Sequence, residues 1–239
     1  MQIDMQRTVA EIAASVPHAW EVFEQVGIDY CCNGSRRLCD ACVEAGLQAD
    51  DVRARLDEVQ RAPVARFVDW SQRGAQDLIE HLLATHHVYT RQSFERLGPL
   101  MQKVLAAHGD AHPELNEIAS ALNALRDDLM PHLMKEERIL FPYILTMARH
   151  RGAGEPIGAA PFGTVRNPIQ MMNRDHEGAG DILAELSART NRYAAPPDAC
   201  GSWRALYEGM RDLQADVHRH MHLETHLLFP LAERLERGA

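Results

Sequence analysis

The sequence predicts an all-α protein, with a four-helix bundle over residues 70–239 preceded by a small helical, cysteine-containing domain over residues 1–62. Aromatic residues make up only 6% of the chain and β-branched runs are rare, so the composition favours helix. Four long helical patterns follow residue 70, and a long Gly/Pro-rich connection lies in the middle of them. Four helices with one long middle connection are typical of a four-helix bundle.

The first segment contains short helices separated by turn signals. Thr8 and Glu11 form a capping box that opens a helix, and Gly27 closes that helical stretch. Asn33 and Gly34 are a turn signal. The rest of the segment is predicted to hold a helix from about Ser35, another over residues 50–61, and a linker at Pro63.

The second segment supplies the four long helices. They are predicted over about residues 75–108, 113–149, 168–191 and 203–237. Residues 151–161 form the crossover between the second and third helices, and Pro196 and Pro197 separate the third from the fourth.

Charge and hydropathy narrow the expected partners and compartment. The net charge is −9 and no Lys/Arg-rich run occurs, so nucleic acid is not an expected partner. No apolar stretch reaches the ~18 residues that a membrane span needs, and the first residues lack the apolar core of a secretory signal. The sequence therefore predicts a soluble, cytoplasmic protein with no membrane partner. In that compartment five cysteines indicate thiols or metal ligands before disulfides.

An internal repeat carries the candidate chemistry. His132 and Glu136 are followed by Leu-Phe-Pro, and His220 and Glu224 are followed by the same three residues after an offset of 88 positions. An aspartate precedes each of these histidines by four residues, so each half reads Asp-x3-His-x3-Glu-x3-Leu-Phe-Pro. Positions i and i+4 share one face of a helix, so each His-Glu pair can point into the bundle.

One upstream histidine completes each half of the repeat. His87 lies 45 residues before His132, and His176 lies 44 residues before His220. Four imidazoles and two carboxylates suit a pair of ions about 3.5–4 Å apart, with the glutamates bridging them. The N/O donor set admits Fe, Mn or Zn, and open coordination positions favour reactivity. The predicted ligands are His87, His132, Glu136, His176, His220 and Glu224.

Some assignments stay open at this point. A single His-x3-Glu pair is common on helix surfaces, and only the two copies in register favour a metal site. His86 competes with His87 as the first ligand. Asp128 and Asp216 are either hydrogen-bond partners of the ligand imidazoles or solvent-facing charges. Four other histidines are interpreted as surface or packing residues: His81, His218, His222 and His226.

The first segment also offers a vicinal thiol pair, Cys31 and Cys32. A disulfide between adjacent cysteines is strained, so the pair favours reactive thiols or ligands. If Ser35 caps the next helix, that helix N-terminus and two following arginines would lower the thiol pKa values. The alternative is two ordinary buried cysteines. The same choice holds for Cys39 and Cys42, whereas Cys200 is interpreted as incidental.

These motifs together resemble one family over almost the whole chain. Asp-Tyr-Cys-Cys-Asn-Gly at residues 29–34, followed by the two His-x3-Glu-x3-Leu-Phe-Pro elements, resembles the RIC (repair of iron centres) family of YtfE/ScdA/DnrN/NorA-like proteins. The resemblance implies a hemerythrin-like bundle whose ligands fall on the six residues named above. It also implies a thiol role for Cys31 and Cys32. Asn33, where many members have Gly, and the Cys39/Cys42 pair depart from the family pattern.

The resemblance further implies a function. The expected cofactor is two Fe ions in a non-haem centre, oxo- and carboxylate-bridged. The protein would repair iron–sulfur clusters damaged by nitrosative or oxidative stress, by supplying iron. Damaged or apo iron–sulfur proteins are the expected partners, NO or O2 the small ligands, and a homodimer a compatible assembly. The alternatives are an NO-reducing enzyme and a non-catalytic module that binds O2 or NO.

Overall fold

The computed structural model describes residues 2–31, 33–61, 68–158 and 160–238. Within these ranges the chain is helical, and its β-structure is limited to two isolated bridges. The chain divides into two compact units. The first unit is Met1–Leu78 with His218–Ala239, and the second unit is Ile79–Val217.

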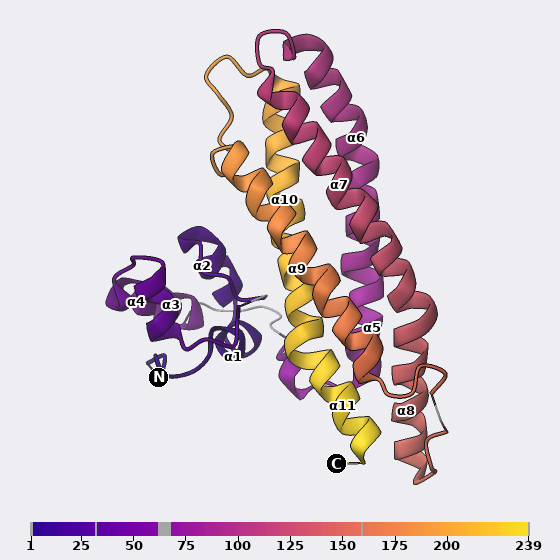
Figure 1. The fold of residues 1–239 in the computed structure, drawn as a ribbon. Helices are drawn as coiled ribbons and strands as arrows, with labels where there is room; N and C mark the ends of the chain where they lie inside the picture. The colour runs from indigo at the N-terminus through magenta and orange to yellow at the C-terminus, as the bar shows by residue number, and fades with distance from the viewer. Residues whose placement is uncertain (1, 32, 62–67, 159, 239) are drawn as a thin grey trace. The chain divides into compact units, whose positions relative to one another are not determined.

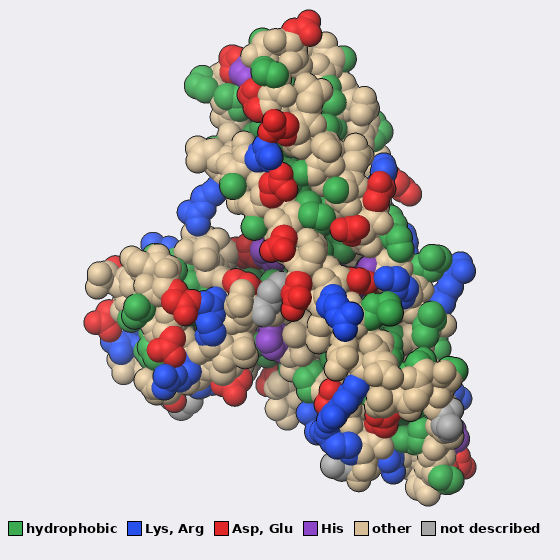
Figure 2. Space-filling view, viewed as in Figure 1, with side chains coloured by type: hydrophobic (Ala, Val, Ile, Leu, Met, Phe, Trp, Pro, Cys, Tyr) green, Lys and Arg blue, Asp and Glu red, His purple; other side chains and the backbone are tan. Residues whose placement is uncertain are grey.

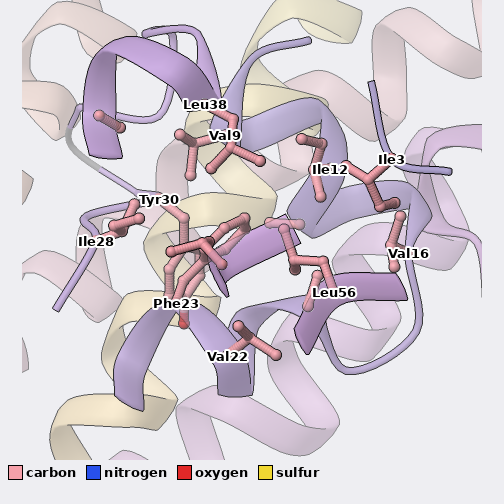
Figure 3. Close-up of a cluster of buried hydrophobic side chains, with 14 of the residues drawn as sticks. Ile3, Val9, Ile12, Val16, Val22, Phe23, Ile28, Tyr30, Leu38 and Leu56 are labelled. Carbon is pink, nitrogen blue, oxygen red and sulfur yellow. The ribbon is translucent and has the colours of Figure 1, made fainter. Parts of the chain in front are cut away.

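The first unit contains short helices around its own apolar core. They are α1 (Val9–Ser15), α2 (Ala19–Val26), α3 (Leu38–Glu44), α4 (Ala49–Arg61) and η1 (Trp70–Gln72). Thr8 Oγ1 accepts from the Glu11 backbone N–H and Glu11 Oε2 accepts from the Thr8 N–H, so the predicted capping box forms. Figure 3 shows the core around Phe23, Tyr30 and Leu56. The linker expected at Pro63 lies outside the described residues.

The helical stretch predicted to open at Thr8 and to close at Gly27 has both of these ends, with Gly27 as the C-cap of α2, but it consists of two helices. α1 ends at Ser15, and Val16 is extended with φ −108° and ψ 122°. Pro17 follows, and a residue before proline is pushed out of the helical region by the proline ring. His18 then takes a left-handed conformation with φ 57° before α2 begins. The proline was the missed signal.

The helix expected from Ser35 begins instead at Leu38, with Arg37 as its N-cap. Backbone hydrogen bonds to α1 explain why this helix begins later in the sequence. The Gly34 carbonyl accepts from the Ala10 N–H and the Arg36 carbonyl accepts from the Val9 N–H, both at the first turn of α1. These bonds satisfy orphan donors of α1 and hold residues 34–36 in a non-helical path. The predicted Ser35 cap near the vicinal cysteines is therefore wrong.

The long helices lie at the positions that the sequence predicts, within a few residues. They are α5 (Ala75–His81) with α6 (Val88–His108), α7 (Glu114–Lys135) with α8 (Phe141–Ala153), α9 (Arg166–Arg189), and α10 (Gly201–Leu223) with α11 (Phe229–Arg237). In the second unit α7 packs against both α6 and α9 (Figure 1). Pro142 and Pro230 each lie just after a π-helical segment, inside a continuous helical stretch, where a proline removes one N–H from the backbone hydrogen-bond ladder.

Three of the four long helical stretches contain a π-helical segment, which the sequence did not predict. These are η2 (Leu82–His87), η3 (Glu136–Leu140) and η4 (Glu224–Leu228). Each one begins or ends at a predicted metal ligand, whereas α9 is α-helical throughout. Isolated π turns inside α-helices are rare and mark functional sites. The local distortion therefore coincides with the candidate chemistry.

The surface carries both acidic and basic side chains, as the absence of a Lys/Arg-rich run in the sequence leads us to expect. Acidic and basic side chains are intermixed over the face shown in Figure 2. Among the described helices, none combines the length and the apolar character required to cross a bilayer.

Candidate metal centre

The second unit brings His87 and Glu136 together in its interior. His87 is the last residue of η2 and Glu136 is the first residue of η3. Both side chains are fully buried, and His87 Nε2 lies 3.5 Å from Glu136 Oε2. A carboxylate in such a place needs a compensating positive charge, because burying an uncompensated ion costs several kcal/mol.

His132 and His176 approach the same carboxylate. His132 Nε2 lies 3.3 Å from Glu136 Oε1 and 3.2 Å from His176 Nε2. His132 comes from the last turn of α7 and His176 from the middle of α9, and both rings are buried. The donor atoms of His132, Glu136 and His176 all lie within 4.8 Å of one another.

The other ring nitrogen of two of these histidines faces a carboxylate. His87 Nδ1 lies 2.8 Å from Glu137 Oε1, and His132 Nδ1 lies 3.3 Å from Asp175 Oδ2. The His132 hydrogen bond, helped by Lys135 and opposed by burial, lowers the pKa of Asp175 to about 2. Burial raises the pKa of Glu137, but the hydrogen bonds from His87 and Arg91 outweigh it, so the net shift is downward. Both carboxylates are therefore ionised acceptors, and each Nδ1 carries the ring proton.

That protonation pattern decides what the interior can hold. With Nδ1 committed to Glu137 or Asp175, Nε2 is the ring nitrogen of His87 and His132 that can serve as a metal ligand, and it faces the oxygens of Glu136. A metal cation at this position would be coordinated by the carboxylate oxygens and by the Nε2 atoms together. Neutral imidazoles plus carboxylate suit Fe, Mn or Zn, so the residues present fit a metal ion.

The first unit holds the second His-Glu pair of the repeat. His220 lies in the last turn of α10, and Glu224 opens η4. Their side chains are 1% and 0% exposed, and His220 Nε2 lies 3.1 Å from Glu224 Oε1. The pair thus repeats the geometry of His132 with Glu136.

The structure separates the alternatives at His86 and at the two aspartates. His86 Nδ1 donates to Asp216 Oδ1 at 3.0 Å, and both side chains are buried. His87, and not His86, faces Glu136. Asp128 is exposed, so it is a solvent-facing charge.

Sequence reasoning missed Glu137 and Asp175, the two acceptors that face ligand histidines. It looked for such partners four residues before each His of the repeat, on the same helix. The acceptors instead come from neighbouring helices, and each is adjacent in sequence to a predicted ligand, Glu136 or His176. Adjacency to a ligand was the available signal.

Cys31 lies buried in the first unit. Its backbone N–H and Sγ both donate to Asp29 Oδ1, at 2.9 and 3.2 Å, and its carbonyl accepts from His226 Nε2 at 2.7 Å.

The residue before Cys31 is held in a similar way. His222 Nδ1 donates to the Tyr30 carbonyl at 3.1 Å, and burial lowers the pKa of His222 to about 4. Gly34 permits this packing, because a Cβ there would lie 2.3 Å from the Tyr30 carbonyl oxygen. Cys32, the other half of the predicted pair, lies outside the described residues.

The remaining cysteines differ from one another in environment. Cys42 belongs to the core of the first unit, where burial raises its pKa. Cys39 is half-buried. Cys200 is exposed directly before α10, and the Trp203 backbone N–H, followed by His108, lowers its pKa to about 7. The interpretation of Cys200 as incidental overlooked this position at a helix N-terminus.

Comparison with known protein families identifies the family to which this chain belongs. A model described as the hemerythrin HHE cation-binding domain matches residues 78–232, which include all six predicted ligands. The chain belongs to the hemerythrin HHE family. The hemerythrin-like bundle and the small helical domain before it are therefore confirmed. A second model, ScdA_N, described as a domain of unknown function, matches residues 5–60 of this hemerythrin-family chain.

Curated relatives agree over nearly the full length of this hemerythrin-family chain. A protein of Pectobacterium atrosepticum named iron-sulfur cluster repair protein YtfE is 33% identical over 96% of this chain and 98% of its own. Proteins with the same name from Cronobacter sakazakii and Escherichia coli O81 are 32% and 31% identical, over 94% of this chain and 95% of theirs. The chain thus also belongs to the YtfE family, which confirms the resemblance drawn from the motifs.

Proposed function

We propose that this protein holds a non-haem di-iron centre and supplies iron for the repair of damaged iron–sulfur clusters. The observation that carries the proposal is the fully buried Glu136 carboxylate, which the Nε2 atoms of His87 and His132 face at 3.5 and 3.3 Å. The cation-binding family and the repair proteins similar to this chain support it.

All six repeat residues are proposed to share one centre, with two ions. Helix α10 supports this grouping, because it runs unbroken from Gly201 to Leu223. Asp216, which binds His86 in the second unit, lies one turn before His220 on that helix, about 6 Å along its axis. The repeat would then supply two imidazoles for each ion, and the carboxylates of Glu136 and Glu224 would help to hold both ions.

The residues supply binding, orientation and charge balance. Glu136 and Glu224, both fully buried, would offset the charge of the ions, while the four imidazoles would add donors without adding charge. Glu137 and Asp175 hold the His87 and His132 rings in the tautomer that presents Nε2. Iron, when bound, supplies an exchangeable Fe2+ that an apo cluster protein can take up.

The proposed acceptors are damaged or apo iron–sulfur proteins of the cytoplasm. Cys31 and Cys32 are proposed to assist the transfer, since thiolates are the natural ligands of iron in such clusters. Burial of Cys31 against Asp29 means that its thiol would act only after that segment opens.

Reconstitution tests the proposal directly. The iron-loaded full-length protein is mixed anaerobically with an apo [4Fe–4S] enzyme and sulfide, and the recovered activity is compared with that from an equal amount of free Fe2+. We expect faster reactivation with the protein, and loss of that advantage in Glu136→Gln, which removes a bridging charge. Glu95→Gln, at an exposed position on α6, is the matched control and should behave as wild type. Reactivation no better than free Fe2+ would contradict iron donation.

Two alternative functions stay predictions. An NO-reducing protein would release N2O from NO under turnover, and headspace measurement with wild type and Cys31→Ala separates it from a binding role. A reversible O2 or NO carrier would give stable adducts without N2O.

A further inference from the structure

Two cations share the acceptor atoms that orient the ligand histidines. Glu137 Oε1 accepts from His87 Nδ1 and also from Arg91 Nη2, both at 2.8 Å. Asp175 Oδ2 accepts from His132 Nδ1 at 3.3 Å and from Lys135 Nζ at 2.8 Å. In each case a single carboxylate oxygen lies between a ligand imidazole and a cation. We call these groups the Arg91 clamp (His87, Glu137, Arg91) and the Lys135 clamp (His132, Asp175, Lys135).

Each clamp is assembled in the same way from two helices. The cation follows its histidine on one helical stretch, four residues on for Arg91 and three for Lys135, and the carboxylate comes from another helix. The carboxylates are about 30% exposed and the cations just under 40%, so both clamps lie between the buried ligands and solvent. Neutralising a cation there leaves no buried charge behind.

Glu137 and Lys135, one member of each clamp, are not repeated in the second half of the ligand repeat. With the offset of 88 residues, Thr225 corresponds to Glu137, and Leu223 corresponds to Lys135. The second half of the repeat therefore keeps its own His-Glu pair without an acid or a cation at these positions. This makes the clamps an addition to the ligand set.

Electrostatics predicts whether the cations strengthen or weaken metal binding. A carboxylate that accepts from Nδ1–H makes the imidazole a better electron donor at Nε2, which strengthens metal binding. A guanidinium or ammonium on the same oxygen withdraws part of that negative charge and also repels the metal ion. Both effects weaken the hold on the metal, so cation and carboxylate act in opposite directions.

We propose that Arg91 and Lys135 are positioning residues that make the bound metal releasable by drawing charge from Glu137 and Asp175. This inference rests on the proposed function, since a protein that supplies iron must bind it and also let it go. If the clamps only held the ligands in place, each clamp residue would strengthen metal binding, and replacing any of them would speed metal release. Under the proposal, replacing a cation slows metal release and replacing a carboxylate speeds it, so the direction of the change separates the two cases.

The test is the rate of metal release from the full-length protein. Wild type and variants are loaded with Fe2+, and in parallel with Zn2+, then mixed with excess chelator while the coloured complex is followed. Glu137→Gln and Asp175→Asn should release metal about tenfold faster or more. Arg91→Gln and Lys135→Met should release it about three- to tenfold more slowly, the range expected for one nearby surface charge.

Charge-conserving variants and a second readout complete the test. Arg91→Lys and Lys135→Arg keep the positive charge and should release metal near the wild-type rate. The reduction potential of the iron centre should fall in Arg91→Gln and rise in Glu137→Gln. If the neutral cation variants release metal as fast as the carboxylate variants, the cations only maintain structure and the proposal is wrong. The zinc release rates decide this even if cluster repair fails, so failure of the two proposals is distinguishable.

Discussion

Cys200 shows how a single residue gains reactivity from a helix end far from the metal ligands. Its thiol precedes α10, and the backbone N–H groups there, with His108, stabilise the thiolate and lower the pKa to about 7. Since the thiolate is the nucleophile, alkylation of Cys200 by iodoacetamide should reach half its maximal rate near pH 7 and decline below that. Peptide mapping by mass spectrometry measures the rate at this site.

The controls for Cys200 use the same assay. Cys200→Ser removes the labelled peptide, and His108→Gln should move the half-maximal point to higher pH because one stabilising partner is lost. A rate that continues to rise up to about pH 9 would show an ordinary exposed thiol.

At the residue scale, prediction was possible where a pattern repeats, and it was not possible where the partner is distant in sequence. The offset of 88 residues identified His132, Glu136, His220 and Glu224 without knowledge of the fold. Asp175 faces His132 across 43 positions, and no periodicity on one helix reports such a pairing. The six-ligand centre as a whole stays a prediction.

At the scale of the element, the π-helical segments are the feature that helix propensity could not predict. An i→i+5 turn has no propensity signature of its own, because its residues are ordinary helix formers. In η3 one extra residue is accommodated directly after the predicted ligand Glu136. The same holds for η4 after Glu224, in the corresponding position of the repeat.

Deleting Arg138, an exposed residue inside η3, tests whether that distortion serves the site. Removing one residue should convert η3 to regular α-helix, because a π turn is an α-helix with one residue inserted. The Glu136 carboxylate would then lose its place between His87 and His132. We expect near-native helicity by circular dichroism, with loss of at least one metal ion by elemental analysis.

Arg138→Ala is the matched control, since it removes the same side chain but keeps the chain length. It should retain the wild-type metal content. Full metal loading in the deletion variant would show that the π turn is not needed to place the carboxylate.

At the scale of the whole molecule, folding and metal binding should be coupled. The interior of the second unit brings the Glu136 carboxyl group within 3.5 Å of His87 Nε2 and 3.3 Å of His132 Nε2, and His176 Nε2 lies 3.2 Å from His132 Nε2. A bound cation would stabilise this arrangement, and such binding couples to folding. Sequence could predict the helices that deliver these groups, because apolar periodicity and turn residues fix them locally. It could not predict how much the free energy of unfolding of the metal-free protein falls because these histidine and carboxylate groups are held close together.

Removal of metal should therefore lower the midpoint of thermal unfolding. A ligand that binds only the folded state at 100 times its dissociation constant adds about 2.7 kcal/mol, and a loss of that size lowers the Tm of a domain of this length by several degrees. Differential scanning fluorimetry of chelated and reloaded protein measures the shift. Glu136→Gln should respond less to metal than wild type, and because it removes a buried negative charge, its metal-free form should unfold at a higher temperature than metal-free wild type. Equal unfolding temperatures for the two metal-free proteins would mean that the Glu136 carboxylate carries no electrostatic strain without metal, and the argument for a cation at this position would fail.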